Sequence, residues 1–359
     1  MITIANALHR VSLWIIIAFL CSFLMRTLLL VDINKRVYNH APGPCRYIPN
    51  IENGAAGLEL TSLGVFMSLG SSHPLRESVT PSIGLFSLTD NQNYIWDDLR
   101  LEGLDFDKNN FSPRHLSSYE SKGRLSLYAV NAFPGHESVE MFLFVKEKKT
   151  LLHQKSLALS SVTSIAAVGS DRLFLTNLAY FSNPFLKTVE LLMQSNLGSL
   201  LLFDGKELRT LDSRIPSPSS VVYDEKRKIL YVGSLLNELV RVYKVKRDLS
   251  VEFQHDINLL SSPSSLFVES YTGDLWVTLH PVLHQAAVHF RDPTTVSPSQ
   301  VLRIRMQEGG KSWVVTEPYA NDGASVSASS AVIFHEQRLL IGSLYGRALL
   351  CDTNKDQIT

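Results

Sequence analysis

Six stretches of similar character recur along this chain and constrain its fold more than any other feature. In each, turn-forming residues precede a run of large apolar residues, most clearly in GDLWVTLH at residues 273–280. Such a run is typical of a buried strand. The copies lie roughly fifty to sixty residues apart, close to the repeat length of propeller blades. They occupy residues 63–70, 123–131, 170–175, 227–234, 273–280 and 337–343.

A second kind of strand follows these copies. Residues 137–145, 239–245 and 301–306 alternate between apolar and polar side chains, which indicates strands with one buried face. Residues 199–203 end at Asp204-Gly205, a hairpin signal. We therefore predict an all-β fold, a six-bladed β-propeller of four-stranded antiparallel blades, with the six apolar copies as the innermost strands.

The N-terminus departs from a globular composition. Residues 11–31 are apolar apart from Ser12, Ser22, Arg26 and Thr27, and about 20 such residues suffice to cross a membrane. A cleaved signal peptide is the alternative, but no small-x-small cleavage site follows and the apolar run continues to residue 31. The predicted organisation is a cytosolic N-terminus (1–10), a transmembrane signal anchor (11–31), a linker (32–46), the propeller (47–353) and a tail (354–359).

Charge and cysteine usage indicate the compartment. The 34 basic and 34 acidic residues balance without a long run of one sign, which argues against a nucleic-acid partner. If Cys45 and Cys351 were bonded, they would join the first blade to the last and require an oxidising compartment. Asn110 begins a glycosylation tripeptide. We therefore expect a lumenal or extracellular propeller in the endoplasmic reticulum, the plasma membrane or both.

Residues 180–197 interrupt the strand pattern. After Pro184, apolar residues recur at helical spacing at Leu186, Val189 and Leu192. The segment is predicted to be a short amphipathic helix packed on one face of the propeller. A helix that docks on a membrane surface or a partner is the alternative.

From about residue 45 to residue 351 the chain resembles the paraoxonase/arylesterase family of six-bladed propellers. The resemblance rests on VEMF at 139–142, AVG at 167–169, TGDLWV at 272–277, VLRI at 301–304 and LLIG at 339–342. It implies a disulfide between Cys45 and Cys351 and an uncleaved hydrophobic N-terminus.

The same resemblance assigns the family's calcium ligands to residues without a carboxylate: Ala56, Gly57, Thr163, Ser164, Ser219, Ser264 and Ser265. Calcium takes about six to eight oxygen ligands, and its affinity depends on how many are charged. The family's catalytic histidines fall at Arg114 and Ala132. We therefore expect no catalytic dyad, metal or cofactor. His115 and His136 lie nearby, but neighbouring strand residues face opposite ways, so His115 is expected to point elsewhere.

Other candidate residues carry weaker signals. His280 ends a strand, where it is either a core histidine with its hydrogen bonds satisfied or a channel residue. His284 and His289 have no third zinc ligand nearby in the sequence. No Gly-x-Ser-x-Gly motif supports a serine hydrolase.

Three functions follow from these observations. Membrane-anchored paraoxonase-like proteins of nematodes assist the assembly and surface expression of degenerin-type channels. The resemblance therefore implies a catalytically degenerate accessory protein or chaperone for a membrane-protein client. The alternative is a calcium-dependent arylesterase or lactonase with ligands drawn from Asp107, Glu120, Glu269 and Asp274. A third possibility is a propeller that binds lipid surfaces through its anchor and the helix at 180–197.

Overall fold

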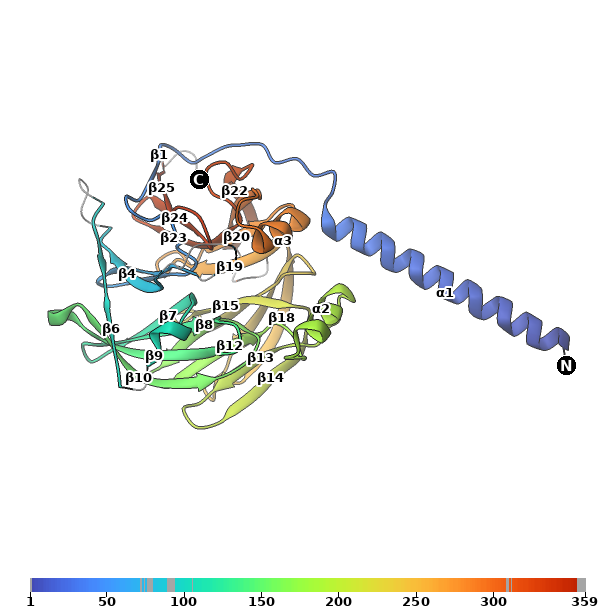
Figure 1. The fold of residues 1–359 in the computed structure, drawn as a ribbon, viewed down its shortest axis with the longest axis horizontal. Helices are drawn as coiled ribbons and strands as arrows, with labels where there is room; N and C mark the ends of the chain where they lie inside the picture. Colours follow the sequence, from blue (N-terminus) through green and yellow to red (C-terminus); the bar gives the residue numbers. More distant parts are fainter. Residues whose placement is uncertain are drawn as a thin grey trace.

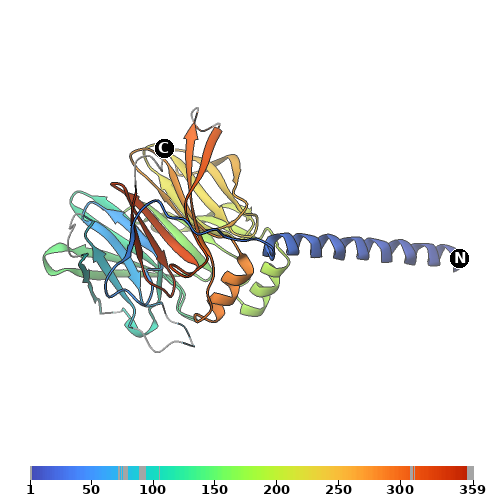
Figure 2. The same ribbon diagram turned by 90° about the horizontal axis from the view of Figure 1, so that it is seen from above.

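A computed structural model describes residues 2–71, 73, 75, 80–88, 94–104, 106–307, 310 and 312–353. A long helix, α1 (Ile2–Val31), projects from a ring of six β-sheets (Figures 1 and 2). Each sheet has four consecutively paired antiparallel strands, and the second has a fifth strand that pairs parallel to its edge. The predicted six-bladed propeller is confirmed. The predicted tail at 354–359 lies outside the described residues.

The blades follow one another along the chain. Blade 1 contains β2 (Leu58–Thr61), β3 (Gly64–Leu69), β4 (Ser82–Phe86) and β5 (Trp96–Asp98). Blade 2 contains β7 (Pro113–Ser121), β8 (Arg124–Asn131), β9 (Ser138–Val145) and β10 (Thr150–Ala158), with β6 (Arg100–Glu102) beside β10. Blade 3 contains β11 (Val162–Gly169), β12 (Arg172–Asn177), β13 (Gly198–Phe203) and β14 (Leu208–Ile215).

The remaining blades repeat this order. Blade 4 contains β15 (Pro218–Asp224), β16 (Ile229–Ser234), β17 (Leu239–Val245) and β18 (Val251–Asn258). Blade 5 contains β19 (Ser262–Val268), β20 (Leu275–His280), β21 (Ser299–Gln307) and β22 (Ser312–Asn321). Blade 6 contains β23 (Ser329–His335), β24 (Arg338–Ser343), β25 (Leu349–Asp352) and the N-terminal strand β1 (Cys45–Tyr47).

The six apolar copies form the second strand of each blade, not the innermost one. The first strands, such as β11, β15 and β19, contact one another around the axis. A second strand is covered on both faces by the adjacent blades, so it is mostly apolar and fully buried: all six residues of β20 are buried, including Thr278 and His280. The innermost strands converge at the axis, where space is limited, and they are rich in small hydroxyl residues. The prediction placed the most apolar strand of each blade at the axis. It was wrong because the strand with the greatest burial is the one between neighbouring blades, not the one at the axis.

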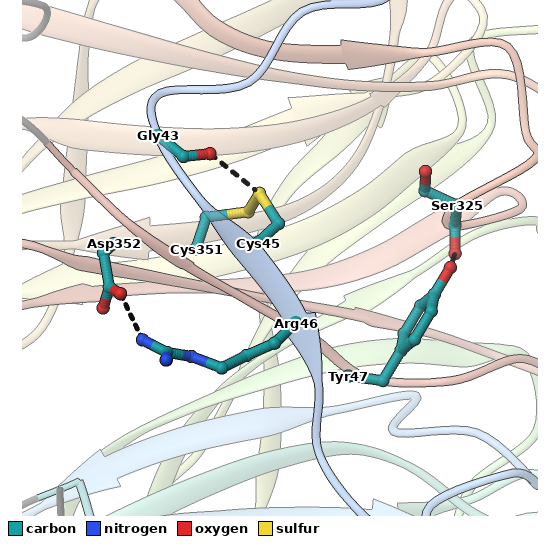
Figure 3. The surroundings of a disulfide bond; sticks show 7 residues. All are labelled: Gly43, Cys45, Arg46, Tyr47, Ser325, Cys351 and Asp352. Carbon is teal, nitrogen blue, oxygen red and sulfur yellow. Dashed lines mark hydrogen bonds and ion pairs between the residues drawn. A yellow bond between two sulfur atoms is a disulfide. The ribbon is translucent and has the colours of Figure 1, made fainter.

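The N-terminal strand completes the last blade. β1 pairs antiparallel with β25, with Cys45 opposite Cys351, and the two cysteines form a disulfide (Figure 3). The neighbouring Arg46 forms an ion pair with Asp352. The disulfide is confirmed, but it does not join the first blade to the last as expected. It lies within blade 6 and holds the chain end that closes the ring.

Three helices gather at one end of the propeller. α2 (Pro184–Leu192) connects β12 to β13, and α3 (Leu283–Arg291) connects β20 to β21. Both lie beside the place where α1 leaves the ring (Figures 1 and 2). Gln194 Nε2 lies 3.4 Å from Thr27 Oγ1, and Lys35 Nζ lies 2.9 Å from Ser261 Oγ. The helix predicted within 180–197 is confirmed, whereas α3 was not predicted.

Candidate functional site: a hydroxyl belt and an axial cavity

A set of short hydroxyl side chains surrounds the propeller axis, and we call it the hydroxyl belt: Ser68, Thr163, Ser164, Ser219 and Ser330. Most of its hydrogen bonds cross from one blade to the next. Their partners and distances are Ser68 Oγ to Arg114 O (2.9 Å), Ser164 Oγ to His115 Nε2 (3.1 Å), Thr163 Oγ1 to Pro218 O (2.9 Å), Ser219 Oγ to Pro263 O (2.7 Å) and Ser330 Oγ to Ala56 O (3.0 Å). At the remaining junction Ser329 N donates to Ser299 Oγ at 2.9 Å.

Neutral groups occupy the other positions that the resemblance assigns to calcium ligands. Ala56 is buried, and a Cβ atom at Gly57 would lie 2.1 Å from the carbonyl oxygen of Arg114. Ser265 is buried and Ser264 half-buried. A side chain longer than glycine therefore does not fit at residue 57 without a backbone shift.

These residues do not suit a calcium ion. None carries a charge, and Thr163 and Ser219 already donate their hydroxyl protons to backbone carbonyl groups. Neutral dipoles alone compensate poorly for the dehydration of a divalent cation. Among the described residues, no group of three His, Cys, Asp or Glu side chains is arranged to hold a metal ion. The belt instead links the blades mechanically.

The residues to which the resemblance assigns the family's dyad, Arg114 and Ala132, are not histidines. Arg114 is exposed and Ala132 half-buried. His136 is exposed in the loop after β8, where its ring contacts Phe133. Alternation along a regular strand predicts that His115 points away from the residues assigned to the calcium site. The structure shows the opposite, because its ring bonds Ser164. The pairing of β7 with β8 shifts register between Pro113 and Leu116, so alternation fails there and the His115 ring reaches Ser164.

An axial cavity of about 660 Å³ opens beyond the belt. It is lined by the C-terminal halves of the innermost strands and the turns after them, and His115 forms part of its wall. Burial lowers the pKa of His115 to about 4, so this ring is neutral at pH 7. Its Nδ1 atom is buried and has no hydrogen-bond partner among the described residues.

A half-buried carboxyl group, Glu59 on β2, lies in the same wall. Its Oε1 atom accepts hydrogen bonds from the backbone N–H and the hydroxyl of Ser118, both at 2.7 Å. Burial raises the pKa of Glu59 to about 7, and the two hydrogen bonds oppose this rise. Sequence reasoning missed Glu59, although a carboxylate in the apolar run LEL was a visible signal.

The four carboxylates considered as alternative calcium ligands do not gather at one site. Asp107 caps a short 3-10 helix, Lys108–Asn110, through Asn109 N. Asp274 is buried and bonded to Arg303. Glu120 and Glu269 lie at the mouth of the axial cavity, where they accept hydrogen bonds from Ser62 and Thr272. Only these last two share a site.

The histidines near α3 form an aromatic cluster. His280 is buried at the end of β20, and its ring lies 5.4 Å from that of Phe290. Burial, with a smaller effect of His289, lowers the pKa of His280 to about 4. His280 Nδ1 has no hydrogen-bond partner among the described residues, so this histidine is in the core but not satisfied. His289 donates from Nδ1 to Thr295 O at 2.6 Å, and His284 is half-buried on the same helix.

The predicted glycosylation acceptor is half-buried. Asn110 Nδ2 donates to Asp107 Oδ2 at 2.7 Å, and Ser112 of the same tripeptide is buried. Modification of Asn110 stays a prediction.

The end of the propeller from which α1 leaves carries exposed apolar side chains, which we call the apolar face. Phe185 and Leu192 on α2 are 74% and 62% exposed, and Leu260, beside the exit of α1, is 78% exposed. α1 itself is long and apolar enough to cross a membrane over Asn6–Leu30 by length and composition, a property that signal sequences share.

Comparison with known proteins places the chain in a family. The family model described as "Arylesterase" matches residues 22–353. Mechanosensory abnormality protein 6 of Caenorhabditis elegans is 41% identical over 99% of this chain and 98% of its own length. Serum paraoxonase/arylesterase 2 of Rattus norvegicus is 29% identical, and serum paraoxonase/arylesterase 1 of Homo sapiens 27% identical, each over 86% of this chain and 88% of its own length.

Solved structures agree on the fold. A luciferin-regenerating enzyme superposes with a TM-score of 0.54 at 11% identity, covering 87% of this chain and 96% of that one. The periplasmic gluconolactonase of Pseudomonas aeruginosa superposes with a TM-score of 0.51 at 10% identity, covering 80% and 77%. At these identities the likeness concerns the fold alone. From the matched length and the 41% identical relative, we conclude that this chain belongs to the arylesterase (paraoxonase) family.

Proposed function

We propose that this protein is a catalytically degenerate, membrane-anchored accessory protein that assists a membrane-protein client such as a degenerin-type channel subunit in the endoplasmic reticulum. The observation that carries the proposal is the 41% identity, over nearly the whole chain, to a relative whose name assigns it to mechanosensation. A calcium-dependent hydrolase is the competing reading, because other relatives are named paraoxonase/arylesterase.

The chemistry of the axis favours the accessory role. Hydrolysis of an ester or lactone by a calcium enzyme needs a cation that polarises the carbonyl group and stabilises the oxyanion. Here the corresponding positions hold neutral groups such as Thr163 and Ser219, whose hydroxyls bond backbone carbonyls. The scaffold is retained without the charged residues that calcium binding requires.

The geometry also favours attachment of one end of the propeller to a membrane. α1 leaves from the apolar face, where Phe185 and Leu192 are exposed. Burial of such side chains in an interfacial layer stabilises the bound state by about 1.5–3 kcal/mol each. The propeller would thus rest on the bilayer through α2 and present its other end to a client.

The test is coexpression with a degenerin-type channel subunit in cells that lack both proteins. Surface biotinylation and whole-cell current should each rise severalfold when the full chain is present. A matched control carries the same propeller behind a cleavable signal peptide, so that only the anchor differs, and this control should lose most of the effect.

Hydrolysis is measured on the same full-length protein, purified in detergent. Aryl-ester and lactone turnover should equal background with calcium and with a chelator. The accessory role would be wrong if a chelator abolished measurable turnover and the protein did not change the amount of channel at the cell surface. The protein would then be a calcium-dependent hydrolase.

A further inference from the structure

The second feature of the axis is the axial cavity, whose mouth lies at the end of the propeller opposite the membrane anchor. β19 begins at Ser262, next to Ser261, which Lys35 of the α1 linker contacts. The strand then ends at Val268, and Glu269 directly after it lines the cavity. Seven residues of strand span roughly 20 Å. The mouth therefore remains open when the other end rests on a membrane.

The charges around the cavity are mostly negative. Five carboxylates and one lysine line it: Glu59, Glu120, Asp224, Glu225, Glu269 and Lys226. Asp224 is neutralised by Arg227, whose Nη1 atom lies 2.9 Å from Asp224 Oδ2. The other three carboxylates, together with Glu59, which is only partly ionised at pH 7, face one lysine, so the potential inside the mouth favours a cation.

The wall also offers surfaces that suit a cationic side chain. The exposed ring of Tyr271 follows Glu269 at the rim of the cavity, and such rings attract guanidinium and ammonium groups, whereas the ring of Tyr223 already has Lys228 over it. In the wall of the cavity, the buried His115 Nδ1 atom has no hydrogen-bond partner among the described residues, so it is available to bond a ligand. The volume of about 660 Å³ falls within the usual range of ligand pockets, about 300–1,000 Å³.

We propose that the axial cavity is a binding site for a guanidinium or ammonium group presented on an extended protein segment, such as an arginine-bearing loop of a partner. The aromatic and carboxylate groups at the mouth bind the cation, and the cavity depth accepts the flanking chain. The site is distinct from the belt, where the family's calcium ligands would lie. The inference does not depend on which client the protein assists, because it concerns binding to the isolated chain.

The experiment uses full-length protein in nanodiscs and a capped fluorescent tetrapeptide with two arginines. Its control ligand contains citrulline instead, which keeps the shape and hydrogen-bond donors without the charge. Fluorescence anisotropy should show binding of the arginine peptide that is at least roughly tenfold tighter than that of the citrulline peptide. Raising the salt to 0.5 M should weaken binding, since exposed charges at the mouth are screened.

Substitutions then locate the site. Glu120→Gln and Glu269→Gln should each weaken binding roughly threefold to tenfold, because each removes one charge from the mouth. Glu252→Gln is the matched control, since Glu252 is an exposed carboxylate on β18 paired with Lys246 outside the cavity. The affinity of the Glu252→Gln variant for the arginine peptide should be unchanged. An equal loss in all three variants would mean nonspecific attraction and would overturn the proposal.

The half-buried carboxyl group of Glu59 gives a second readout. Because burial raises the pKa of Glu59, a bound cation should favour its ionised form and release a proton, so binding should tighten between pH 6 and pH 8. His115, Tyr119 and Glu120 of β7 and His335 of β23 line the same cavity. Glu59→Gln should therefore remove the part of the pH dependence that Glu59 causes.

One further ligand distinguishes a cation on a protein segment from a free small-molecule cation. Agmatine, a free guanidinium compound, should bind at least tenfold more weakly than the peptide if the site accepts a chain segment. Equal affinities would overturn the assignment to a protein segment. Equal binding of the arginine and citrulline peptides would overturn the site itself.

Discussion

The hydrogen bonds of the hydroxyl belt predict that the Ser219 hydroxyl group contributes measurably to the free energy of unfolding. Ser219 Oγ donates to the carbonyl of the buried Pro263 in the next blade at 2.7 Å. Replacing Ser219 with alanine removes this donor and leaves a buried acceptor without it, which costs about 1–3 kcal/mol. For a protein of this size, 1 kcal/mol corresponds to about 2 °C in Tm. Ser219→Ala should therefore lower Tm by roughly 2–6 °C.

A second substitution perturbs the same hydrogen bonds from the other side. A Cβ atom at Gly233 would lie 2.4 Å from Ser220 Oγ and 3.2 Å from Ser219 Oγ, so Gly233→Ala should displace both hydroxyl groups. We expect a loss of similar size, and less than the sum of the two losses when both substitutions are combined.

The assay is thermal unfolding of the full-length protein in detergent, followed by intrinsic fluorescence. Ser250→Ala is the control, because Ser250 Oγ also makes a 2.7 Å hydrogen bond, to Asp248, but on the surface. If Ser219→Ala left Tm within the range of that control, the belt would not be a structural link between blades. The axial hydroxyls would then need another explanation.

Three further predictions concern other parts of the chain. Because the pKa of His280 falls from 6.5 to about 4 on folding, stability should be lost as the pH falls from 6.5 towards 4, and His280→Leu should flatten this part of a Tm–pH curve. Cys351→Ser should destabilise the ring by about 2–5 kcal/mol and leave β1 susceptible to protease, as measured by limited proteolysis. In bilayers, Phe185→Ser with Leu192→Ser should reduce photo-crosslinking to lipid severalfold, whereas Val314→Ser, 44% exposed on β22, should not.

Much of the fold was predictable because it depends on short-range patterns. The repeat of six apolar stretches gave the number of blades, and the alternation in residues 239–245 predicted β17 over its whole length. The long apolar run at the N-terminus predicted α1, although the helix begins earlier, at Ile2. α3 escaped prediction because its apolar residues, such as Leu283 and Ala286, are interrupted by histidine and glutamine.

The candidate site was less predictable, because it depends on contacts between blades. His115 was expected to point away from the axis, and a register shift in β7 reversed that expectation. Glu120 and Glu269 were considered as calcium ligands, yet what brings them together is the axial cavity, whose wall also contains Glu59. Residues separated by about 150 positions reach one site because each ends an innermost strand of a closed ring.

The sequence by itself determined the class of fold, the family, the apolar N-terminal helix and the prediction that neutral residues such as Ser219 stand where the family has its calcium ligands. These properties follow from composition, periodicity and local motifs. Only the tertiary structure decided which strand faces the axis, which carbonyl groups accept hydrogen bonds from the hydroxyl groups of the belt, and that an acidic cavity opens at the end of the propeller opposite α1. The physical reason is that closing the ring brings the six blades together, and contacts across that closure are not encoded in any one local stretch of sequence.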